Sequence, residues 1–290
     1  MKRDSLLGIL AGLTATAIWG GMYVVSKAVM AIIPPFSLIV LRLMLGILTL
    51  AVIVLVRKNW KVTAKQFWGI FAVGLIGYGV SLGFQFVGTN LSTAANGSLV
   101  TSATPAFVLL FAAIILKEKI TPRRLLALVV ASLGVLAVID PRTAQLSSQL
   151  FWGNLSLVAA ALTWALYSVL VRRVTRNVDV LSTSLIAFAG GLPVCLPLGA
   201  WEAATRGYGP ISWGVVAGVL FLGIISTALA MYLWNTAFAK LEAGVASLTF
   251  FAQPVVGTVL GVIFLGDNIN PLFIVGGIFI GIGLIISSKE

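Results

Sequence analysis

Long apolar runs, separated by short polar segments, divide this chain almost from end to end. A helix needs about 20 mainly apolar residues to cross a hydrocarbon core about 30 Å thick, and the runs are close to that length. We therefore predict an all-α membrane protein with ten transmembrane helices. The predicted spans are 6–30, 36–56, 66–89, 93–116, 123–139, 151–172, 180–200, 212–238, 243–265 and 271–287.

Residues in one half of the chain match residues in the other half at a constant separation. The matched pairs are Pro105 and Pro254, Glu118 and Asp267, Ile120 and Ile269, and Pro122 and Pro271. Such self-similarity predicts two copies of one unit, at residues 1–145 and 146–290. Each copy holds five predicted spans, and because five is odd the second copy enters the bilayer inverted. Inverted repeats are typical of transporters whose site lies at the repeat interface.

The composition indicates that lipid surrounds most of the chain. Hydrophobic residues make up 60% and charged residues 9%, and the mean hydropathy is +1.10. A soluble domain has about 25% charged residues. We therefore expect the lipid bilayer to be a partner.

The positions of the basic residues predict how the chain is oriented. The net charge is +11, but only Arg142 and Arg206 of the 19 Lys and Arg fall in predicted outer loops, and only Lys27 and Arg42 fall inside spans. The positive-inside rule then places both termini in the cytoplasm. The charge is an orientation signal and a contact for anionic lipids, so we expect no nucleic acid partner.

The N-terminus permits one alternative. Lys2 and Arg3, an apolar run and Ala15-Thr16-Ala17 resemble a cleavable signal peptide. The apolar run continues to Ala31 and has a counterpart in the second repeat, which favours a retained span.

Two absences limit the chemistry. The chain has no histidine, the commonest general base and a usual zinc ligand, and its single cysteine, Cys195, excludes an internal disulfide. We expect no catalytic site, no metal and no cofactor. A membrane-embedded enzyme is the weaker alternative, because it needs a nucleophile with a base or a metal cluster.

Aromatic residues recur in the first span of each copy. Trp19, Tyr23 and Lys27 are four residues apart and share a helix face; Trp164 matches Trp19 in the second copy, and Tyr167 follows it. Indole and phenol groups at mid-membrane need polar partners that lipid does not supply. We predict that these aromatic residues line a central cavity, with ordinary helix packing as the alternative.

The fourth and ninth spans carry matched prolines. Pro105 follows Asn96 in one span, and Pro254 follows Phe250 and Gln253 in the other. A proline removes a backbone hydrogen bond and kinks a helix, and interruptions at matching positions point to a transport site. We expect hinges at the prolines and substrate contacts beside them; the alternative is that the prolines only shape the helices.

The third and eighth spans add further polar and aromatic groups. Tyr78 and Gln85 are seven residues apart on one face, and Tyr232 lies in the eighth span. Amides in spans often serve only to join helices. Together with the aromatic rings, however, they suit a small amphipathic solute.

Charged groups inside the spans are few. Lys27 and Arg42 either reach the membrane surface with their long side chains or contact an anionic group of the substrate. The acidic residues all map to loops or helix ends, so no buried carboxylate is expected for proton coupling, which favours facilitated diffusion over proton antiport. The acids are Asp4, Glu118, Asp140, Asp179, Glu202, Glu242, Asp267 and Glu290.

Turns and glycines complete the pattern. Glu118 precedes Thr121-Pro122 and Asp267 precedes Asn270-Pro271, which predicts helix starts with Thr or Asn as N-cap and Pro at the first position. The spacings Gly257-x-x-x-Gly261 and Gly277-x-x-x-Gly281 permit close helix approach, either within the chain or in a dimer. Both a monomer and a homodimer are compatible with them.

These features together resemble a known domain. A span with a central proline, an acid at its end, the Thr-Pro or Asn-Pro turn, and a final helix with Gly134-Val135-Leu136 or Gly276-Gly277 is similar to the EamA domain of the drug/metabolite transporter superfamily, as are Trp19-Gly20 and Arg42. The departure is Asp267, where Glu is usual.

The resemblance implies a ten-helix bundle with a cavity formed by spans 1, 3, 4, 6, 8 and 9, and with spans 5 and 10 behind. Similar proteins export amino acids and other metabolites from bacteria, so the resemblance implies a location in the bacterial inner membrane. We therefore expect an alternating-access exporter of small metabolites, amino acids first. A multidrug or lipid exporter of the same superfamily is the alternative.

Overall fold

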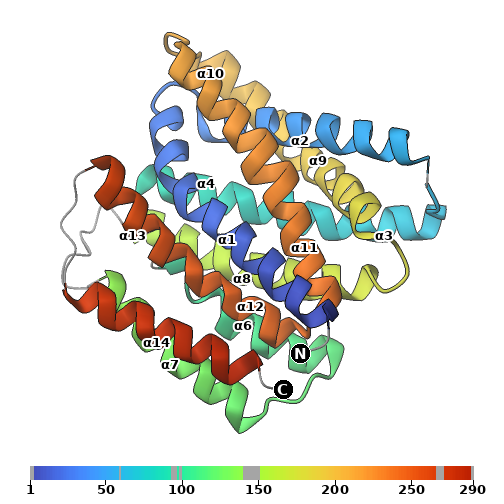
Figure 1. Cartoon of the computed structure of the whole chain (residues 1–290). Coiled ribbons are helices and arrows are strands. Elements are labelled where there is room, and N and C mark those ends of the chain that lie inside the picture. The colour runs from blue at the N-terminus through green and yellow to red at the C-terminus, as the bar shows by residue number, and fades with distance from the viewer. Residues whose placement is uncertain are drawn as a thin grey trace.

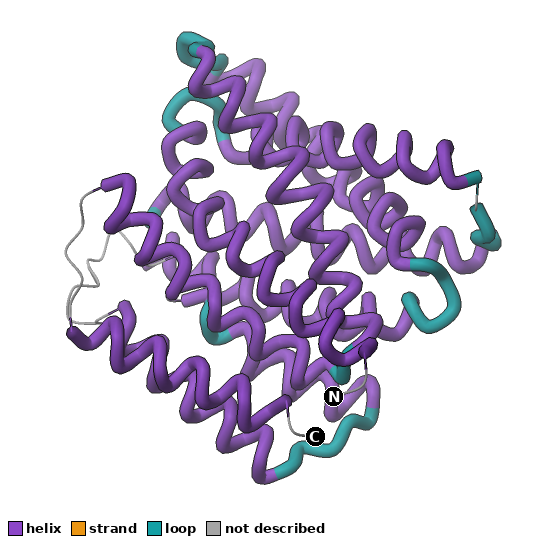
Figure 2. The backbone as a smooth tube through the Cα atoms, in the orientation of Figure 1, coloured by secondary structure: helices purple, strands orange, loops and turns teal. Residues whose placement is uncertain are grey.

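The computed structural model describes residues 3–58, 60–92, 97, 100–139, 151–265 and 271–288, and the regular elements within these ranges are all helical (Figures 1 and 2). The first part of the chain contains α1 (Arg3–Met30), α2 (Pro35–Arg57), α3 (Ala64–Gly74), η1 (Leu75–Ser81), α4 (Leu82–Leu91), α6 (Thr104–Phe111), η2 (Ala112–Leu116) and α7 (Pro122–Ile139). The second part contains α8 (Phe151–Val174), α9 (Val180–Arg206), α10 (Trp213–Leu220), η5 (Phe221–Leu229), α11 (Ala230–Lys240), α12 (Ala243–Leu248), η6 (Thr249–Phe251), α13 (Ala252–Leu265) and α14 (Pro271–Ser288).

Six of the described helices are long and apolar enough to cross a membrane. Three lie before residue 92, namely α1, α2 and the continuous stretch from α3 to α4; the others are α8, α9 and the stretch from α10 to α11. Shorter apolar helices cover Thr104–Leu116, Ala243–Gly257 and Ile274–Gly283. The prediction of a helical membrane protein is confirmed at this level.

Local sequence sets several of the helix ends. Pro35 occupies the first turn of α2, where its missing N–H costs nothing, and Lys58 ends that helix in a left-handed conformation with φ 49°. Thr63 and Gln66 form a capping box at the start of α3. The Asp179 carboxylate accepts the backbone N–H of Ser182 and so starts α9.

Two of the long helices change geometry in the middle. The segments η1 and η5 are π-helical and interrupt the stretches α3–α4 and α10–α11. A π-helical turn leaves some carbonyls without their usual intrahelical partners, and such turns are frequent at functional sites.

Packing between the two parts of the chain builds the bundle. Helix α2 packs on α9 and α7 packs on α14, while α1 contacts α11 and α13, and α8 contacts η1, α4 and α6. The pair α7 and α14 lies at one edge of the bundle (Figure 1). There the backbones approach closely: a Cβ on Gly134 would lie 2.6 Å from the carbonyl oxygen of Gly276. Gly134 and Gly283 therefore serve packing within the chain, whereas a Cβ on Gly281 would meet no atom within 4 Å.

One end of the bundle carries many basic side chains. We call it the basic end: α1 begins there at Arg3, α8 ends there with Arg172 and Arg173, and α11 ends there at Lys240. The end of α14 lies nearby (Figure 1).

Candidate functional site

A buried cavity lies between the two parts of the chain. Its lining comes from α1, η1, α4, α6, α8, α11, η6 and α13, and from Thr101, which precedes α6. The space open to the centre of a water molecule is only ≈ 20 Å³, about enough for one or two waters. The lining residues are Trp19, Met22, Ser81, Leu82, Gln85, Thr101, Thr104, Ala160, Ala161, Trp164, Met231, Phe250 and Gln253.

A cluster of aromatic rings forms one wall. The rings of Trp19 and Trp164 meet edge to face with centroids 5.7 Å apart, and both side chains face the interior, 3% and 7% exposed. Trp234 packs against Trp19 at 5.3 Å and against Phe250 at 5.5 Å. The indole N–H of Trp19 donates to the carbonyl of Ser226 in η5 at 3.0 Å. This carbonyl is the polar partner that a mid-membrane indole requires.

Neutral polar groups form another part of the lining. Gln85 Nε2 donates to the Tyr23 hydroxyl (2.8 Å), and that hydroxyl is 2.9 Å from Thr101 Oγ1. Thr101 in turn donates to the carbonyl of Gly97 at 2.6 Å. Tyr23 is not itself among the lining residues but holds Gln85 and Thr101, which are.

Two polar atoms at the cavity have no hydrogen bond to any residue that the structure describes. They are Gln253 Nε2 and Thr104 Oγ1, and their residues are 2% and 1% exposed. A buried polar group left unpaired costs about 1–3 kcal/mol. A water or solute in the cavity would offset that cost.

The remaining predicted aromatics lie behind the lining. The Tyr167 hydroxyl donates to Asn235 Oδ1 at 2.8 Å, so the Tyr78 hydroxyl, 2.6 Å away, donates to Tyr167. Asn235 Nδ2 continues the chain to Ser184 Oγ at 2.9 Å. The Tyr167 ring stacks on Trp164 at 4.8 Å and supports it from behind.

Two other predicted residues are not part of the observed lining. Tyr232 is half-buried and packs against the hydrophobic core. Asn96 lies outside the described residues.

Each matched proline lies just after a local change in helical geometry. Pro105 lies in the first turn of α6, and Pro254 lies in the first turn of α13, which follows the 3₁₀ segment η6. One backbone carbonyl beside the second break, that of Thr249, accepts the Thr16 hydroxyl at 2.9 Å. The breaks adjoin the cavity lining at Thr104 and Gln253.

Arg42 is fully buried behind the cavity wall. Its Nε donates to Thr227 Oγ1 at 2.8 Å, and both terminal nitrogens lie 3.7 Å from the Met22 sulfur. The guanidinium also lies over the Phe86 ring, 5.0 Å from its centroid. Within the part of the chain that the structure describes, no carboxylate pairs with it. Because Met22 lines the cavity, one thioether separates this charge from the space inside.

Lys27 has a different environment. Its Nζ donates to the carbonyls of Thr89, Asn90 and Ser92 at 2.8–2.9 Å. These groups lie at the end of α4, where a cation is favourable to the helix dipole. The structure therefore places Lys27 at a helix end and not in the cavity lining.

One acid is more deeply placed than the sequence suggests. Helix α9 continues to Arg206, beyond the predicted end at 200, so Glu202 lies inside it and is 4% exposed. Its carboxylate accepts the backbone N–H of Ser37 in the first turn of α2 at 2.9 Å. Glu202 thus lies near the end of a helix, as expected of the acidic residues, but its carboxylate is buried, accepts a hydrogen bond at the start of α2 and is absent from the cavity lining.

Several site residues were not predicted. Met22 and Met231 line the cavity, as do Ser81 and Thr104, and Trp234 is the fully buried centre of the aromatic wall. Met22 lies three residues after Trp19 on the same helix face, a spacing that could have identified it. The others depend on which helices become neighbours.

Comparison with known proteins agrees with this architecture. An "Uncharacterized transporter" of Archaeoglobus fulgidus is 27% identical over 285 residues, which is 97% of this chain and 98% of that protein. The "Uncharacterized transporter YetK" of Bacillus subtilis is 24% identical over 282 residues, 92% of this chain and 84% of that one. A solved crystal structure matches with a TM-score of 0.78 and 21% identity, covering 97% of this chain and 96% of the other, which shows a shared fold.

The pattern of one transporter family matches the chain twice. The two matches cover residues 6–139 and 151–289, one in each predicted copy. The protein is a membrane transporter, and it belongs to the EamA-like transporter family.

Proposed function

We propose that this protein is an alternating-access carrier of small metabolites in the bacterial inner membrane, with amino acids as the first substrate class and export as the direction. The observation that carries the proposal is the cavity, lined from both parts of the chain and holding the unpaired polar atoms of Gln253 and Thr104. At ≈ 20 Å³ it is too narrow for a metabolite. The bundle therefore has to open during transport.

Contacts between the halves support an inverted repeat of ten spans. Helix α1 packs on α11 and α13, and its counterpart α8 packs on η1, α4 and α6; α2 pairs with α9 and α7 with α14. These contacts correspond to one another when the two halves are exchanged. Lys27 donates to the Thr89 carbonyl, and the matching Arg172 donates to the Phe238 carbonyl at 2.8 Å.

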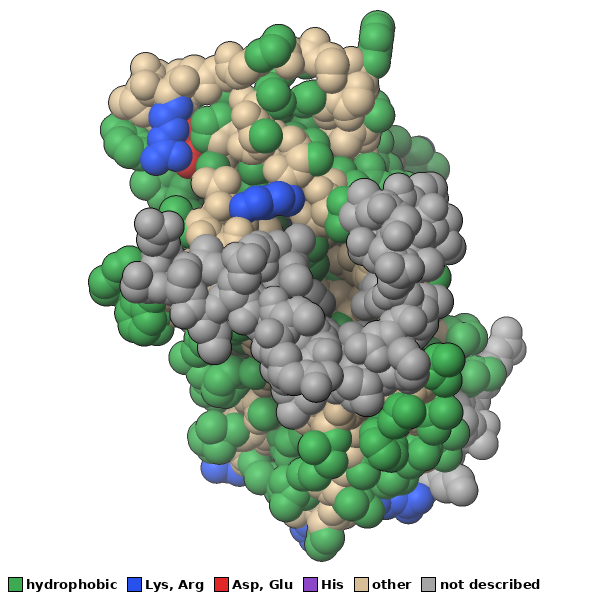
Figure 3. Space-filling model, turned by 90° about the vertical axis from the view of Figure 1, so that its left-hand side faces the viewer, with side chains coloured by type: hydrophobic (Ala, Val, Ile, Leu, Met, Phe, Trp, Pro, Cys, Tyr) green, Lys and Arg blue, Asp and Glu red, His purple; other side chains and the backbone are tan. Residues whose placement is uncertain are grey.

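The charge distribution supports cytoplasmic termini. The described basic residues gather at the basic end, where α1 begins and α14 ends (Figure 1). The opposite end shows a largely hydrophobic or uncharged surface with few Lys and Arg among the described side chains (Figure 3). Exposed tryptophans lie toward both ends of the bundle: Trp68 near the basic end, and Trp152 and Trp213 at helix starts toward the opposite end. Tryptophan is enriched at both membrane interfaces.

The cavity chemistry favours a neutral or anionic solute with an apolar body. The rings of Trp19, Trp164 and Phe250 offer apolar contact, and the amides of Gln85 and Gln253 offer hydrogen bonds. The field of the buried Arg42 repels cations from this space. No acidic residue belongs to the described lining, which supports facilitated diffusion without proton coupling. The helix breaks at Pro105 and Pro254 are the hinges on which the halves would rock.

A thermal-shift screen of the purified protein tests the substrate class. A ligand at a hundred times its dissociation constant stabilises the folded state by about 2.7 kcal/mol, so an amino acid substrate raises the melting temperature. Gln253→Leu abolishes that rise because it removes a hydrogen-bonding group from the cavity. Trp152→Phe, at the lipid interface, is the matched control and keeps it. Stabilisation by cationic dyes and not by any amino acid would instead identify a multidrug exporter.

A further inference from the structure

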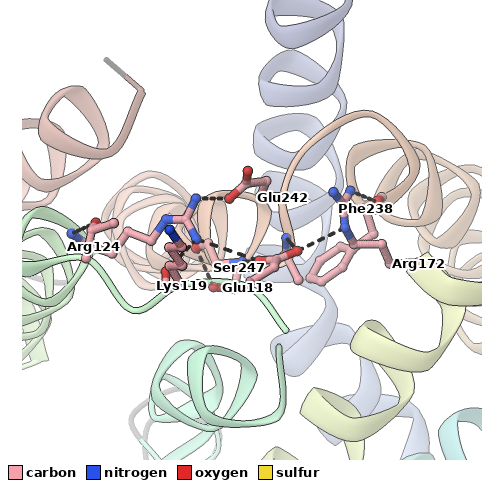
Figure 4. A network of polar contacts seen from close by, with 10 residues as sticks. Glu118, Lys119, Arg124, Arg172, Phe238, Glu242 and Ser247 are labelled. Carbon is pink, nitrogen blue, oxygen red and sulfur yellow. Dashed lines mark hydrogen bonds and ion pairs between the residues drawn. The ribbon is translucent and has the colours of Figure 1, made fainter. Parts of the chain in front are cut away.

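The carboxylate of Glu118 joins the two halves of the protein at the basic end (Figure 4). Arg172 at the end of α8 holds it with Nε 3.1 Å from Glu118 Oε1. The backbone N–H groups of Ala243 and Gly244, at the start of α12, donate to its two oxygens at 3.0 and 3.3 Å. All three partners belong to the second half, whereas Glu118 belongs to the first.

A second ion pair also joins the two halves of the protein. Arg124 in α7, from the first half, pairs with Glu242, from the second half, and lies 3.8 Å from Glu118. Arg124 Nη1 also donates to the Lys119 carbonyl at 3.0 Å. The Glu118 and Arg172 side chains are only 10% and 16% exposed, so water screens this pair weakly, whereas Glu242 is 51% exposed and its pair with Arg124 is screened more strongly.

These ion pairs lie beyond the cavity and on one side of it. Arg172 follows the lining residue Trp164 by eight residues of the same helix, about 12 Å at 1.5 Å per residue. Between the two levels, Trp234 and Phe238 are fully buried and in ring contact. On the side of the basic end, the cavity is therefore followed by buried aromatic rings and then by the ion pairs, which border an opening of ≈ 420 Å³.

We propose that Glu118 is the centre of an ionic latch, made of Glu118, Arg124, Arg172 and Glu242, that keeps the cavity closed toward the basic end and opens when the solute passes that way. The inference rests on the proposed alternating access. If the halves move as units, the pairs Glu118–Arg172 and Arg124–Glu242 separate, since each pair has one member in each half. The hydrogen bonds from the start of α12 to Glu118 also break, and this connects the latch to η6 and α13, which follow α12 in the chain.

A purely structural role would give a different result from a latch. A group that only supports folding lowers stability when it is changed, without favouring either open state. A latch shifts the population toward the state open at the basic end, and a minor state is commonly 0.1–10% populated before such a shift. Accessibility of the cavity from each side distinguishes the two roles.

The test uses thiol labelling in oriented membrane vesicles. The single native cysteine is replaced (Cys195→Ala), and a reporter is placed on the cavity wall (Ala161→Cys). An impermeant thiol reagent is then added from either side. With Glu118→Gln we expect labelling from the basic end to accelerate by about tenfold and labelling from the opposite side to slow. The matched control is Asp4→Asn, which removes an exposed ion pair with Lys240 at the same end and leaves both rates unchanged.

Each outcome decides one claim. Unchanged labelling in a folded Glu118→Gln protein overturns the latch, even if amino acids are transported. Faster labelling supports the latch even where no amino acid binds, in which case only the proposed substrate class fails. If Glu118→Gln does not fold, Arg172→Lys is measured instead: it keeps the charge but not both contacts, to Glu118 and to the Phe238 carbonyl, and an intermediate rate is expected. A rate equal to that of the parent overturns the latch.

Discussion

Replacing Arg42 by glutamine removes the positive charge behind the cavity wall. The side chain is fully buried, its Nε donates to Thr227, and both terminal nitrogens touch the sulfur of Met22, which lines the cavity. Because no described carboxylate compensates this charge, its field extends into the cavity. We predict that Arg42→Gln changes affinity according to the charge of the solute.

The geometry gives the size of the effect. With the thioether of Met22 between them, a carboxylate in the cavity lies about 7 Å from the guanidinium, and two unit charges at that distance interact by about 2.4 kcal/mol at an effective dielectric constant of about 20. Loss of this attraction lowers the affinity for a monocarboxylate by about 50-fold. In a zwitterion the ammonium, about 2.5 Å farther away, cancels most of the attraction. The zwitterion therefore loses only about 0.6 kcal/mol of binding free energy, which is about a threefold loss of affinity.

Competition binding in lipid nanodiscs measures these ratios. The panel holds a monocarboxylate, an amino acid and an amine with the same apolar body, and each affinity is compared between the parent and Arg42→Gln. In Arg42→Gln the affinity for the amine should rise, and the affinity for the monocarboxylate should fall the most. Arg42→Lys is the control, since it keeps the charge and therefore the order of preference. Equal changes for all three ligands would show that Arg42 shapes the fold and does not act on the solute.

Three stability predictions follow from the packing, each measured by thermal or SDS unfolding in nanodiscs. Trp234→Ala removes the centre of the aromatic wall and should lower the free energy of unfolding by about 3–5 kcal/mol. A decrease below about 1 kcal/mol contradicts the central position of Trp234. Gly134→Ala places a methyl group 2.6 Å from a carbonyl oxygen of α14 and destabilises the protein, whereas Gly69→Ala, with no atom within 4 Å, is neutral or stabilising by about 0.5–1 kcal/mol. Tyr167→Phe leaves a buried amide oxygen without its donor and should cost about 1–3 kcal/mol, more than Tyr78→Phe, which removes only a donor to a hydroxyl.

The course of the helices could be predicted because it depends on local properties of the chain. Apolar runs of span length, Pro35 at a helix start and Thr63 with Gln66 each determine an element through nearby residues. The predicted kinks at Pro105 and Pro254 fall where the helical geometry changes, since Pro105 follows a turn and Pro254 follows the 3₁₀ segment η6. Proline excludes a regular hydrogen bond, but the surrounding packing decides whether the helix bends or stops and restarts.

The site could be predicted only in part, because a shared helix face does not identify the neighbour across it. Trp19 and Trp164 were proposed as cavity walls, and they meet at the lining. Tyr78 and Tyr167 face the same region, yet their hydroxyls bond to each other one layer behind. Trp234 was not predicted, since its ring contacts come from separate elements, at Trp19, Trp164 and Phe250.

Ion pairs between residues far apart in the chain could not be predicted from the sequence, for the same reason. The turn after Glu118 predicts that Thr121 starts a helix, and the Thr121 hydroxyl does accept the N–H of Arg124 at 3.2 Å. Nothing local indicates that Glu118 also pairs with Arg172 and caps α12 in the other half. Those contacts exist only after the halves pack together.

Counterflow in proteoliposomes tests most directly the claim that a solute crosses through this cavity by alternating access. Vesicles loaded with an unlabelled amino acid are diluted into a trace of the same labelled compound, with and without an imposed pH gradient. The account predicts transient accumulation of label that is the same in both conditions and is lost in Gln253→Leu. Protein-containing vesicles that exchange no amino acid, or that accumulate label only when a pH gradient is imposed, would contradict it.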